Sequence, residues 1–249
     1  MTAKAPPFAA LRQLWIESFG DSAQIPDAFF STAFSPNRYM AIFVGNTPVS
    51  ALYWLPCTCN GSRFAYIYAA ATRKDHRGHG YFRQLLDQVH EKLQKDGYEG
   101  VILVPGCPAL VSLYEKFGYR VCTAISEISC EPDSMPVFIQ AITKQRYAER
   151  RRDFLPEDGI VQEGETLDFL ETMATFYEGA DFLLVAAIEN GQLIGQELLG
   201  NPTAAPGILR ALNCRNGTFL TPGNSRPFAM YLPLTENCPT PSYFGLALD

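Results

Sequence analysis

The chain has 249 residues, of which 47% are hydrophobic, and it carries a formal net charge of −6 at pH 7. This composition is that of a globular protein with ample material for a packed core, and the acidic balance argues against nucleic acid as a partner. The first residues, MTAKAPPF, lack the apolar stretch of a signal peptide, and the longest purely apolar run, FLLVAAI, is far below the ~20 residues of a membrane-spanning helix. We therefore expect a cytoplasmic protein that is neither secreted nor bound to a membrane.

The cysteines, histidines and charges narrow the classes of ligand. The seven cysteines include no CxxC pair and there are only three histidines, which predicts free thiols and no metal cofactor. Residues 1–130 hold 12 basic and 10 acidic side chains, a net of +2, whereas residues 131–249 hold 8 and 16, a net of −8. An anionic ligand should therefore prefer the first half and a cationic ligand the second.

The chain opens with two predicted helices and three predicted strands. Residues 8–19 place leucines and aromatic residues at helical spacing, and a second short periodic stretch follows at PDAFFSTAF. Next, YMAIFV and VSALYWL are separated by GNTP, which is typical of a turn between two antiparallel strands. A third strand, RFAYIYAAAT, follows the turn CNGS.

The best-defined element is a helix over residues 80–96, which Gly97 ends. Its apolar residues form one stripe: Phe82, Leu85, Leu86, Val89 and Leu93. The wholly apolar GVILVPG then predicts a buried strand, and Pro108 suits the first turn of a further helix that ends before Gly118. The stretch YRVCTAISEISC predicts another pair of strands.

The segment EPDSMP, residues 131–136, interrupts this pattern with two prolines and is the best candidate for a boundary. We therefore divide the chain into a domain of residues 1–130 and an acidic α/β region of residues 137–249. The block FLLVAAIENGQLIGQELLG repeats the strand, turn and strand of MAIFVGNTPVSALYWL. One interpretation is that the second region is a degenerate copy of the first, although hairpins also resemble one another by chance.

A glycine-rich loop joins the third strand to the helix of residues 80–96. In RKDHRGHGYF, several unpaired backbone N–H groups at the start of the helix converge near Gly78 and Gly80, and the helix dipole adds partial positive charge there. This pattern predicts a pyrophosphate site. The two common phosphate loops fit less well, because the chain has no GxxxxGK[ST] and Arg83 stands where GxGxxG needs its third glycine.

The order of helices, hairpin, strand, RKDHRGHGYFRQLL, strand and LVSLYEKFGYRV resembles the GCN5-related N-acetyltransferase (GNAT) family over about residues 8–125. The resemblance implies an α/β fold in which helices flank a mixed, mostly antiparallel sheet. It also implies that the pyrophosphate of acetyl-CoA is bound by the loop, with the residues Arg77, Gly78, His79, Gly80, Tyr81 and Phe82. Phe82 departs from the family, which has a small residue there, but it lies on the apolar stripe and can face the core while its N–H faces the phosphate.

The resemblance implies two further parts of the site. The third strand separates from its neighbour, so that the pantetheine arm of acetyl-CoA pairs with the backbone at Ala70, Ala71 and Thr72, where an N–H could also hold the oxyanion of the intermediate. The alternative for the alanines is tight packing of a helix on the sheet. Tyr114 of LYEKFGY matches the tyrosine that protonates the departing CoA thiolate, and its alternative is a core tyrosine.

These features together predict direct transfer of an acyl group from acetyl-CoA to a primary amine in a ternary complex. Relatives often use a glutamate on the central strand as base, whereas FAYIYAAAT offers only tyrosines. The base is then a water chain, Glu127 or a group of the acidic second half. His76 and His79 are interpreted as loop residues at the phosphate end.

The net charge of −8 in the second half favours a cationic acceptor such as a polyamine, an aminoglycoside-like molecule or a lysine side chain. The alternative function is a catalytically silent acyl-CoA sensor or scaffold. The sequence leaves the oligomeric state open, a homodimer included.

Overall fold

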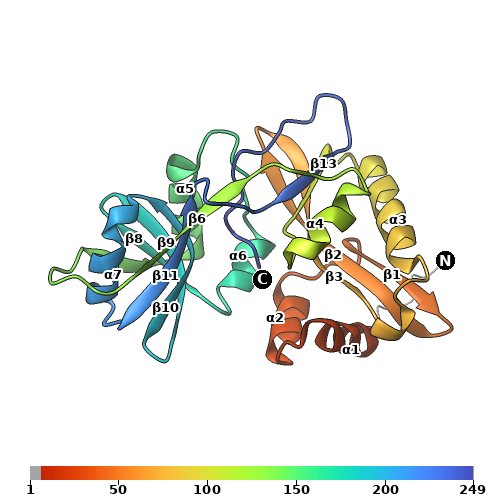
Figure 1. The fold of residues 1–249 in the computed structure, drawn as a ribbon, viewed down its shortest axis with the longest axis horizontal. Helices are drawn as coiled ribbons and strands as arrows, with labels where there is room; N and C mark the ends of the chain where they lie inside the picture. The colour runs from red at the N-terminus through yellow and green to blue at the C-terminus, as the bar shows by residue number, and fades with distance from the viewer. Residues whose placement is uncertain (1–6, 249) are drawn as a thin grey trace.

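The computed structural model describes residues 7–248 and arranges them as two β-sheets that lie side by side, with helices around each (Figure 1). The first sheet has the strand order β1-β2-β3-β4-β13-β5 and the second β12-β6-β11-β10-β9-β8-β7. Strands β3 and β4 are parallel, as are β10 and β11, and the other neighbours pair antiparallel. The expected fold, a mixed and mostly antiparallel sheet flanked by helices, is confirmed.

The first half of the chain follows the predicted order of elements. Helices α1 (Phe8–Phe19) and α2 (Gln24–Thr32) precede the strands β1 (Tyr39–Val44), β2 (Thr47–Cys59) and β3 (Ser62–Thr72). A 3-10 turn, η1 (Lys74–His76), leads towards α3 (Tyr81–Lys95), and then come β4 (Gly100–Leu103), α4 (Pro108–Glu115) and β5 (Arg120–Val121). Helix α3 buries its apolar stripe because four of its residues share one face at a spacing of three to four: Leu85, Leu86, Val89 and Leu93.

Strand β6 (Ala124–Cys130) ends the first half. The second half has the same kinds of element and begins with β7 (Ile139–Ile142), α5 (Lys144–Phe154) and α6 (Glu165–Leu170). Strands β8 (Thr175–Gly179), β9 (Phe182–Glu189) and β10 (Gln192–Gly200) follow, and a 3-10 turn, η2 (Pro202–Ala204), runs directly into α7 (Ala205–Ala211). The last strands are β11 (Asn216–Pro222), β12 (Arg226–Pro227) and β13 (Met230–Pro233).

The two sheets exchange strands between the halves of the chain. Strand β6, from the first half, pairs antiparallel with β11 of the second sheet. Strand β13, near the other end of the sequence, lies between β4 and β5 of the first sheet and pairs antiparallel with both. The boundary at residues 131–136 therefore does not coincide with the division between the two sheets. The prolines of this segment indicate a loop, but they do not indicate which sheet the neighbouring strands join.

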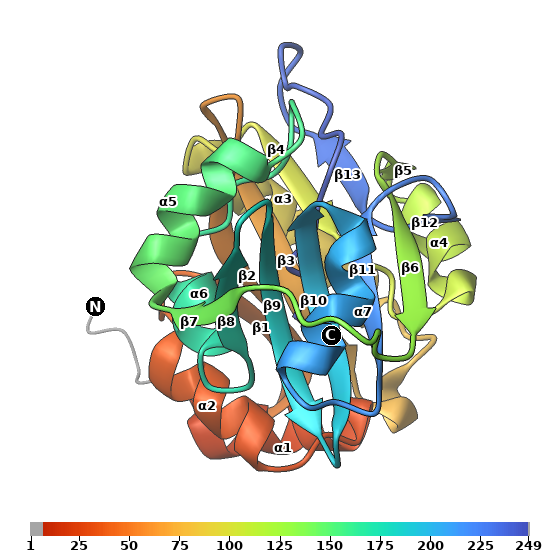
Figure 2. The same ribbon diagram turned by 90° about the vertical axis from the view of Figure 1, so that its left-hand side faces the viewer.

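The second sheet repeats the order of the first. In both sheets a strand hairpin is followed by a short 3-10 turn, a helix and a strand parallel to the hairpin's second strand: β2-β3-η1-α3-β4 and β9-β10-η2-α7-β11. By its place in the sheet the β9–β10 hairpin corresponds to β2–β3, and not to the β1–β2 hairpin whose sequence it resembles. Helix α7 packs on the outer face of its sheet (Figure 2), as α3 packs on the first.

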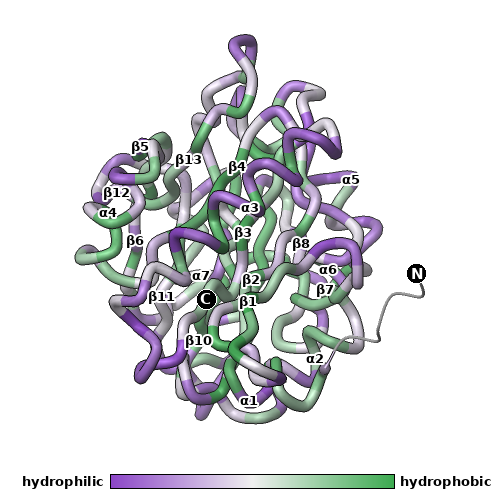
Figure 3. Tube along the Cα trace, turned by 90° about the vertical axis from the view of Figure 1, so that its right-hand side faces the viewer, coloured by the Kyte–Doolittle hydropathy of each residue, from purple (hydrophilic) through white to green (hydrophobic). Residues whose placement is uncertain are grey.

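Hydrophobic cores lie under both crossover helices and between the two sheets. The strands at the centre of the tube in Figure 3 are largely hydrophobic, whereas many of the loops at its rim are hydrophilic. The core between the sheets joins α2, β2 and β3 to α6 and to residues 243–248. Within residues 7–248, no helix combines the length and the apolar character needed to cross a bilayer.

Candidate active site

Strand β3 leaves its neighbour β4 half-way along its length. The parallel pairing joins Phe64 to Gly100 and ends where Tyr66 faces Ile102. Beyond that point β3 pairs only with β2. From Ile67 to Thr72 the edge of β3 has therefore parted from β4.

A β-bulge in the pairing of β3 with β2 follows shortly after the point where β3 parts from β4. Tyr68 faces Tyr53 of β2 and Ala71 faces Ala51, so two residues of β3, Ala69 and Ala70, stand opposite one residue of β2. Ala69 has a left-handed φ of +47°, which is uncommon for a residue with a Cβ. Bulges bend a strand and are over-represented next to active sites, and backbone strain of this kind is concentrated at functional positions.

The loop after β3 contains two glycines and leads to the uncapped N-terminus of α3. Gly78 and Gly80 have φ of +81° and +82°, and a Cβ at either position would meet nothing within 4 Å. Their backbone conformation, and not a lack of room, therefore calls for glycine. Helix α3 begins at Tyr81 with no side-chain cap, so the N–H groups of its first turn have no helical partner and can bind an anion.

Basic side chains surround this loop. Arg77 lies on the surface and its Nε donates to the carbonyl oxygen of Thr72, 3.1 Å away, which ties the loop to the end of β3. His79 is exposed, and its Nδ1 lies 3.0 Å from the carbonyl oxygen of Arg77. The hydrogen bond between His76 and Asp75 lowers the pKa of Asp75, so this carboxylate stays ionised beside the basic side chains. Both histidines thus contact their own loop, as interpreted from the sequence.

The second sequence motif meets the loop at the first turn of α3. The ring of Phe82 packs edge-on against Tyr114 at the end of α4, with ring centroids 6.1 Å apart. Phe82 packs with the core under α3 as its place on the apolar stripe predicts. Tyr114 is buried and also contacts Tyr119, at 5.6 Å, so its ring is part of the core as well as close to the loop.

The alanines of β3 have two different surroundings. Ala71 packs under α1 with Leu11 and Leu14, and its carbonyl oxygen accepts a hydrogen bond from Ser50, so helix-on-sheet packing does account for its small side chain. Ala70 lies on the other face, against the core under α3. Thr72 is hydrogen-bonded through its hydroxyl to that of Ser50, 2.8 Å away. The side chains of Ala70 and Ala71 thus pack on the two faces of β3 and not at the edge towards β4.

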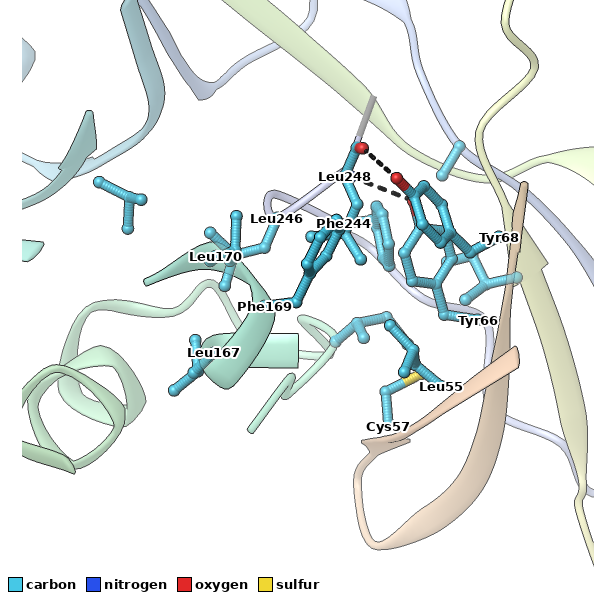
Figure 4. Packing of buried hydrophobic residues seen from close by; sticks show 14 of the residues in the cluster. Leu55, Cys57, Tyr66, Tyr68, Leu167, Phe169, Leu170, Phe244, Leu246 and Leu248 are labelled. Atoms are coloured by element: carbon cyan, nitrogen blue, oxygen red, sulfur yellow. Dashed lines mark hydrogen bonds between the residues drawn. The ribbon is translucent and has the colours of Figure 1, made fainter. Parts of the chain in front are cut away.

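Residues 243–248, here called the final segment, were not foreseen as part of this site. The hydroxyl of Tyr68 donates to the carbonyl oxygen of Leu248 at 2.9 Å, and the N–H of Leu248 donates to the hydroxyl of Tyr66 at 3.2 Å. In Figure 4 the final segment lies between these tyrosines and Phe169 of α6. One signal was present in the sequence: apolar residues alternate with others at the end of the chain, a pattern typical of an extended segment with one buried face.

Glu127, one of the bases considered from the sequence, is exposed on β6 of the second sheet, where it faces Leu220 of β11. Within residues 7–248, no three histidine, cysteine or acidic side chains come together as metal ligands would.

The loop that corresponds to the pyrophosphate loop in the second sheet is built differently. Asn201 accepts hydrogen bonds from the N–H and hydroxyl of Thr203, so the turn before α7 is already capped. Pro202 and Pro206 stand in the first turns of η2 and α7, where they remove backbone donors. A Cβ on Gly200 would lie 2.3 Å from the carbonyl oxygen of Asp181, so this glycine serves close packing. This end of the second sheet therefore lacks the open glycine loop of the first.

Residues 2–122 match the sequence model of the acetyltransferase (GNAT) domain. The first half of the chain is a GNAT domain. No curated protein matches the chain. Among solved structures, a GCN5-related N-acetyltransferase from Anabaena variabilis superposes with a TM-score of 0.73 at 12% identity, over 94% of this chain and 72% of that one. A GCN5-related N-acetyltransferase from Kribbella flavida gives 0.68 at 17% identity, over 91% and 69%.

Eis1 from Mycobacterium abscessus gives a TM-score of 0.67 at 11% identity, over 94% of this chain and 73% of that one. At such identities these likenesses establish the fold. Because they extend over more than nine-tenths of the chain, the shared fold extends beyond the GNAT domain into the second half of the chain.

Proposed function

We propose that the chain is an N-acetyltransferase that moves the acyl group of acetyl-CoA to a primary amine by direct attack within a ternary complex. One observation carries the proposal: β3 parts from β4 beyond Tyr66, and it leads to an uncapped helix N-terminus preceded by two left-handed glycines. A cosubstrate with a peptide-like arm and a pyrophosphate at its end matches that sequence of backbone groups.

The described residues fit acetyl-CoA at three points. The backbone N–H groups of residues 77–82, in the glycine loop and the first turn of α3, donate hydrogen bonds to the pyrophosphate oxygens. Arg73, Lys74 and Arg77 supply positive charge for the remaining phosphate oxygens. The amide groups of the pantetheine arm pair with the edge of β3 at Ala70, Ala71 and Thr72, as an added strand would.

The reaction follows from this placement. The amine nitrogen forms a bond to the thioester carbon, the carbonyl oxygen becomes an oxyanion held by a backbone N–H of β3, and the C–S bond then breaks. Tyr114 gives its proton to the CoA thiolate, and the amine nitrogen loses its own proton to a base. Because the inward side chains of β3 are Tyr66 and Tyr68, that base comes from outside the strand: a water chain, Glu127 or a group of the acidic second half.

The acceptor is proposed to be cationic. The second half of the chain has a net charge of −8, and a wall of that charge attracts a polyamine, an aminoglycoside-like molecule or a lysine side chain. A screen in which neutral or anionic amines are the better acceptors would contradict this assignment. All seven cysteines are free thiols, which suits our further proposal that the reaction takes place in the reducing cytoplasm.

Calorimetric titration with acetyl-CoA tests the cosubstrate site. We expect micromolar binding by the wild type and its loss in Arg77→Ala/Gly80→Glu, which places a carboxylate where the pyrophosphate belongs. Gly61→Glu is the matched control, because Gly61 has a φ of +80° and open space like Gly80 but lies in the β2–β3 turn. No binding by the wild type, or equal loss in the control, would overturn the site.

A catalytically silent acyl-CoA sensor is the second candidate, favoured by the absence of a carboxylate on β3 among the described residues. Thiol release from acetyl-CoA in the presence of spermidine, kanamycin or a lysine-containing peptide separates the two. Release that depends on the amine establishes the transferase, and binding without release establishes the sensor.

A further inference from the structure

A second bulge turns an acidic side chain of β10 into the core between the sheets. Leu193 and Leu198 both pack under α7, although an odd spacing would place them on opposite faces of a regular strand. The pairing with β9 shifts between Gly195 and Glu197, so Gln196 is an extra residue that reverses the alternation. Glu197 consequently faces inwards and is fully buried, at 0% exposure.

Glu197 is held by three side chains from two elements. Arg151 of α5 donates to both carboxylate oxygens, with Nε and Nη2 each 2.8 Å from its oxygen. Tyr147, one turn earlier on the same face of α5, donates to Oε2. Tyr243 of the final segment donates to Oε1 at 3.1 Å. A buried carboxylate with this many donors is fully satisfied and fixes the positions of all three.

The final segment passes directly over this carboxylate. A Cβ on Gly245 would lie 1.8 Å from Oε1 of Glu197, so the backbone is in close contact with the charge. The N–H of Ile160 donates to the carbonyl oxygen of Tyr243, and Arg151 Nη1 donates to the carbonyl oxygen of Ile160, which closes the network around the segment.

Three more side chains, those of Gln162, Tyr66 and Tyr68, connect the final segment to β3. The side-chain amide of Gln162 donates to the carbonyl oxygen of Leu246 at 2.7 Å and accepts from its N–H at 3.3 Å, as a neighbouring strand would. Leu248 then meets the hydroxyls of Tyr66 and Tyr68. Tyr68 immediately precedes Ala69, where β3 has its bulge beside the proposed acetyl-CoA site.

We propose that the Arg151–Glu197 pair is a positioning device for acceptor binding: it holds the final segment against Tyr66 and Tyr68, and this segment forms the wall that the amine contacts. The inference rests on the proposed function. It assigns Arg151, Glu197, Tyr243 and Gln162 to acceptor positioning, and it makes the second sheet a contributor to the selectivity of the site that the first sheet builds.

Amide hydrogen exchange tests the attachment without any substrate. In Tyr243→Phe, which deletes the hydroxyl that joins the final segment to Glu197, we expect the amides of Leu246 and Leu248 to exchange at least tenfold faster than in the wild type. The control is Leu198→Val, which removes a methylene from the residue next to Glu197 on the opposite face of β10 and should leave those two amides protected. Equal protection in Tyr243→Phe and wild type would overturn the attachment.

Steady-state thiol release with spermidine, kanamycin or a lysine-containing peptide tests the role. Tyr243→Phe should raise the KM for the amine about five- to tenfold, with the KM for acetyl-CoA unchanged within twofold, and Leu198→Val should change neither. Faster exchange with unaltered amine KM would show a purely structural segment and refute the proposal. The same variants are also titrated with acetyl-CoA. Failure of the proposed function would appear as absent acetyl-CoA binding by the wild type, whereas failure of the positioning role alone would leave that binding intact.

Discussion

The buried ion pair between Arg151 and Glu197 predicts an unusually large loss of stability from a one-atom change. Replacing Glu197 by Gln removes the negative charge from a site where both partners are nearly inaccessible, with side-chain exposures of 3% and 0%. Burial by itself lowers the pKa of Arg151, and the carboxylate of Glu197 more than offsets that effect. Because a guanidinium is too basic to lose its proton inside a protein, Glu197→Gln leaves it charged and without its partner. Leaving a buried charge without its counter-ion costs about 3–5 kcal/mol, a large part of the ~5–15 kcal/mol that keeps a typical domain folded.

The neighbouring arginine on α5, Arg152, and its partner Glu163 supply the control. Arg152 lies 2.6 Å from Glu163, so its geometry is equally close, but the side chains are 63% and 36% exposed. Glu163→Gln makes the same chemical change in contact with water, where an ion pair is worth about 1 kcal/mol or less. Equilibrium unfolding in urea measures both free energies. Equal losses in Glu197→Gln and Glu163→Gln would refute the reasoning, because burial would then make no difference.

Three other features give independent predictions. Ala69→Gly should raise the free energy of unfolding by up to ~1 kcal/mol in urea titrations, because glycine adopts the left-handed φ of this bulge without a Cβ penalty, and a loss of stability would contradict the strain. Burial lowers the pKa of His90 below the usual histidine value of about 6.5, so the unfolded chain takes up its proton first and stability should fall as the pH drops below about 6.5; a wild-type pH slope retained in His90→Gln would argue against this cause. Residues 1–122 expressed alone should lack cooperative thermal unfolding, because β13 is missing between β4 and β5, and a sharp transition by circular dichroism would show that the exchanged strand is dispensable.

Local features of the sequence were enough to predict the elements of the GNAT domain. The apolar stripe of α3, the glycines of its loop and the turn between β1 and β2 are each formed by residues that are close in the sequence, and periodicity indicates which face of an element is buried. The same information placed Phe82 in the core and Gly80 at the start of its helix.

The pairing partner of a strand depends on residues far away in the sequence, so strand pairing was less predictable than the elements themselves. The residues of β13 show no sign that they pair with β4 and not with the second sheet. Glu197 is a charged residue in an apolar strand, and its burial depends on the extra residue Gln196, which no alternation pattern reveals in advance. The contacts of Tyr66 and Tyr68 come from residues some 180 positions later, so the strand itself could not indicate them.

The strand exchange also determines when the first sheet can be completed during translation. Strands β4 and β5 leave the ribosome early, yet the strand that joins them begins at Met230, after more than a hundred further residues. At a synthesis rate of about 5–20 residues per second, the first sheet stays open for roughly 5–20 s, with the apolar edge of β4 unpaired in a crowded cell. Such an edge can recruit strands from other chains. Chaperone capacity and translation speed over residues 122–230 should therefore govern how much of this protein accumulates in active form.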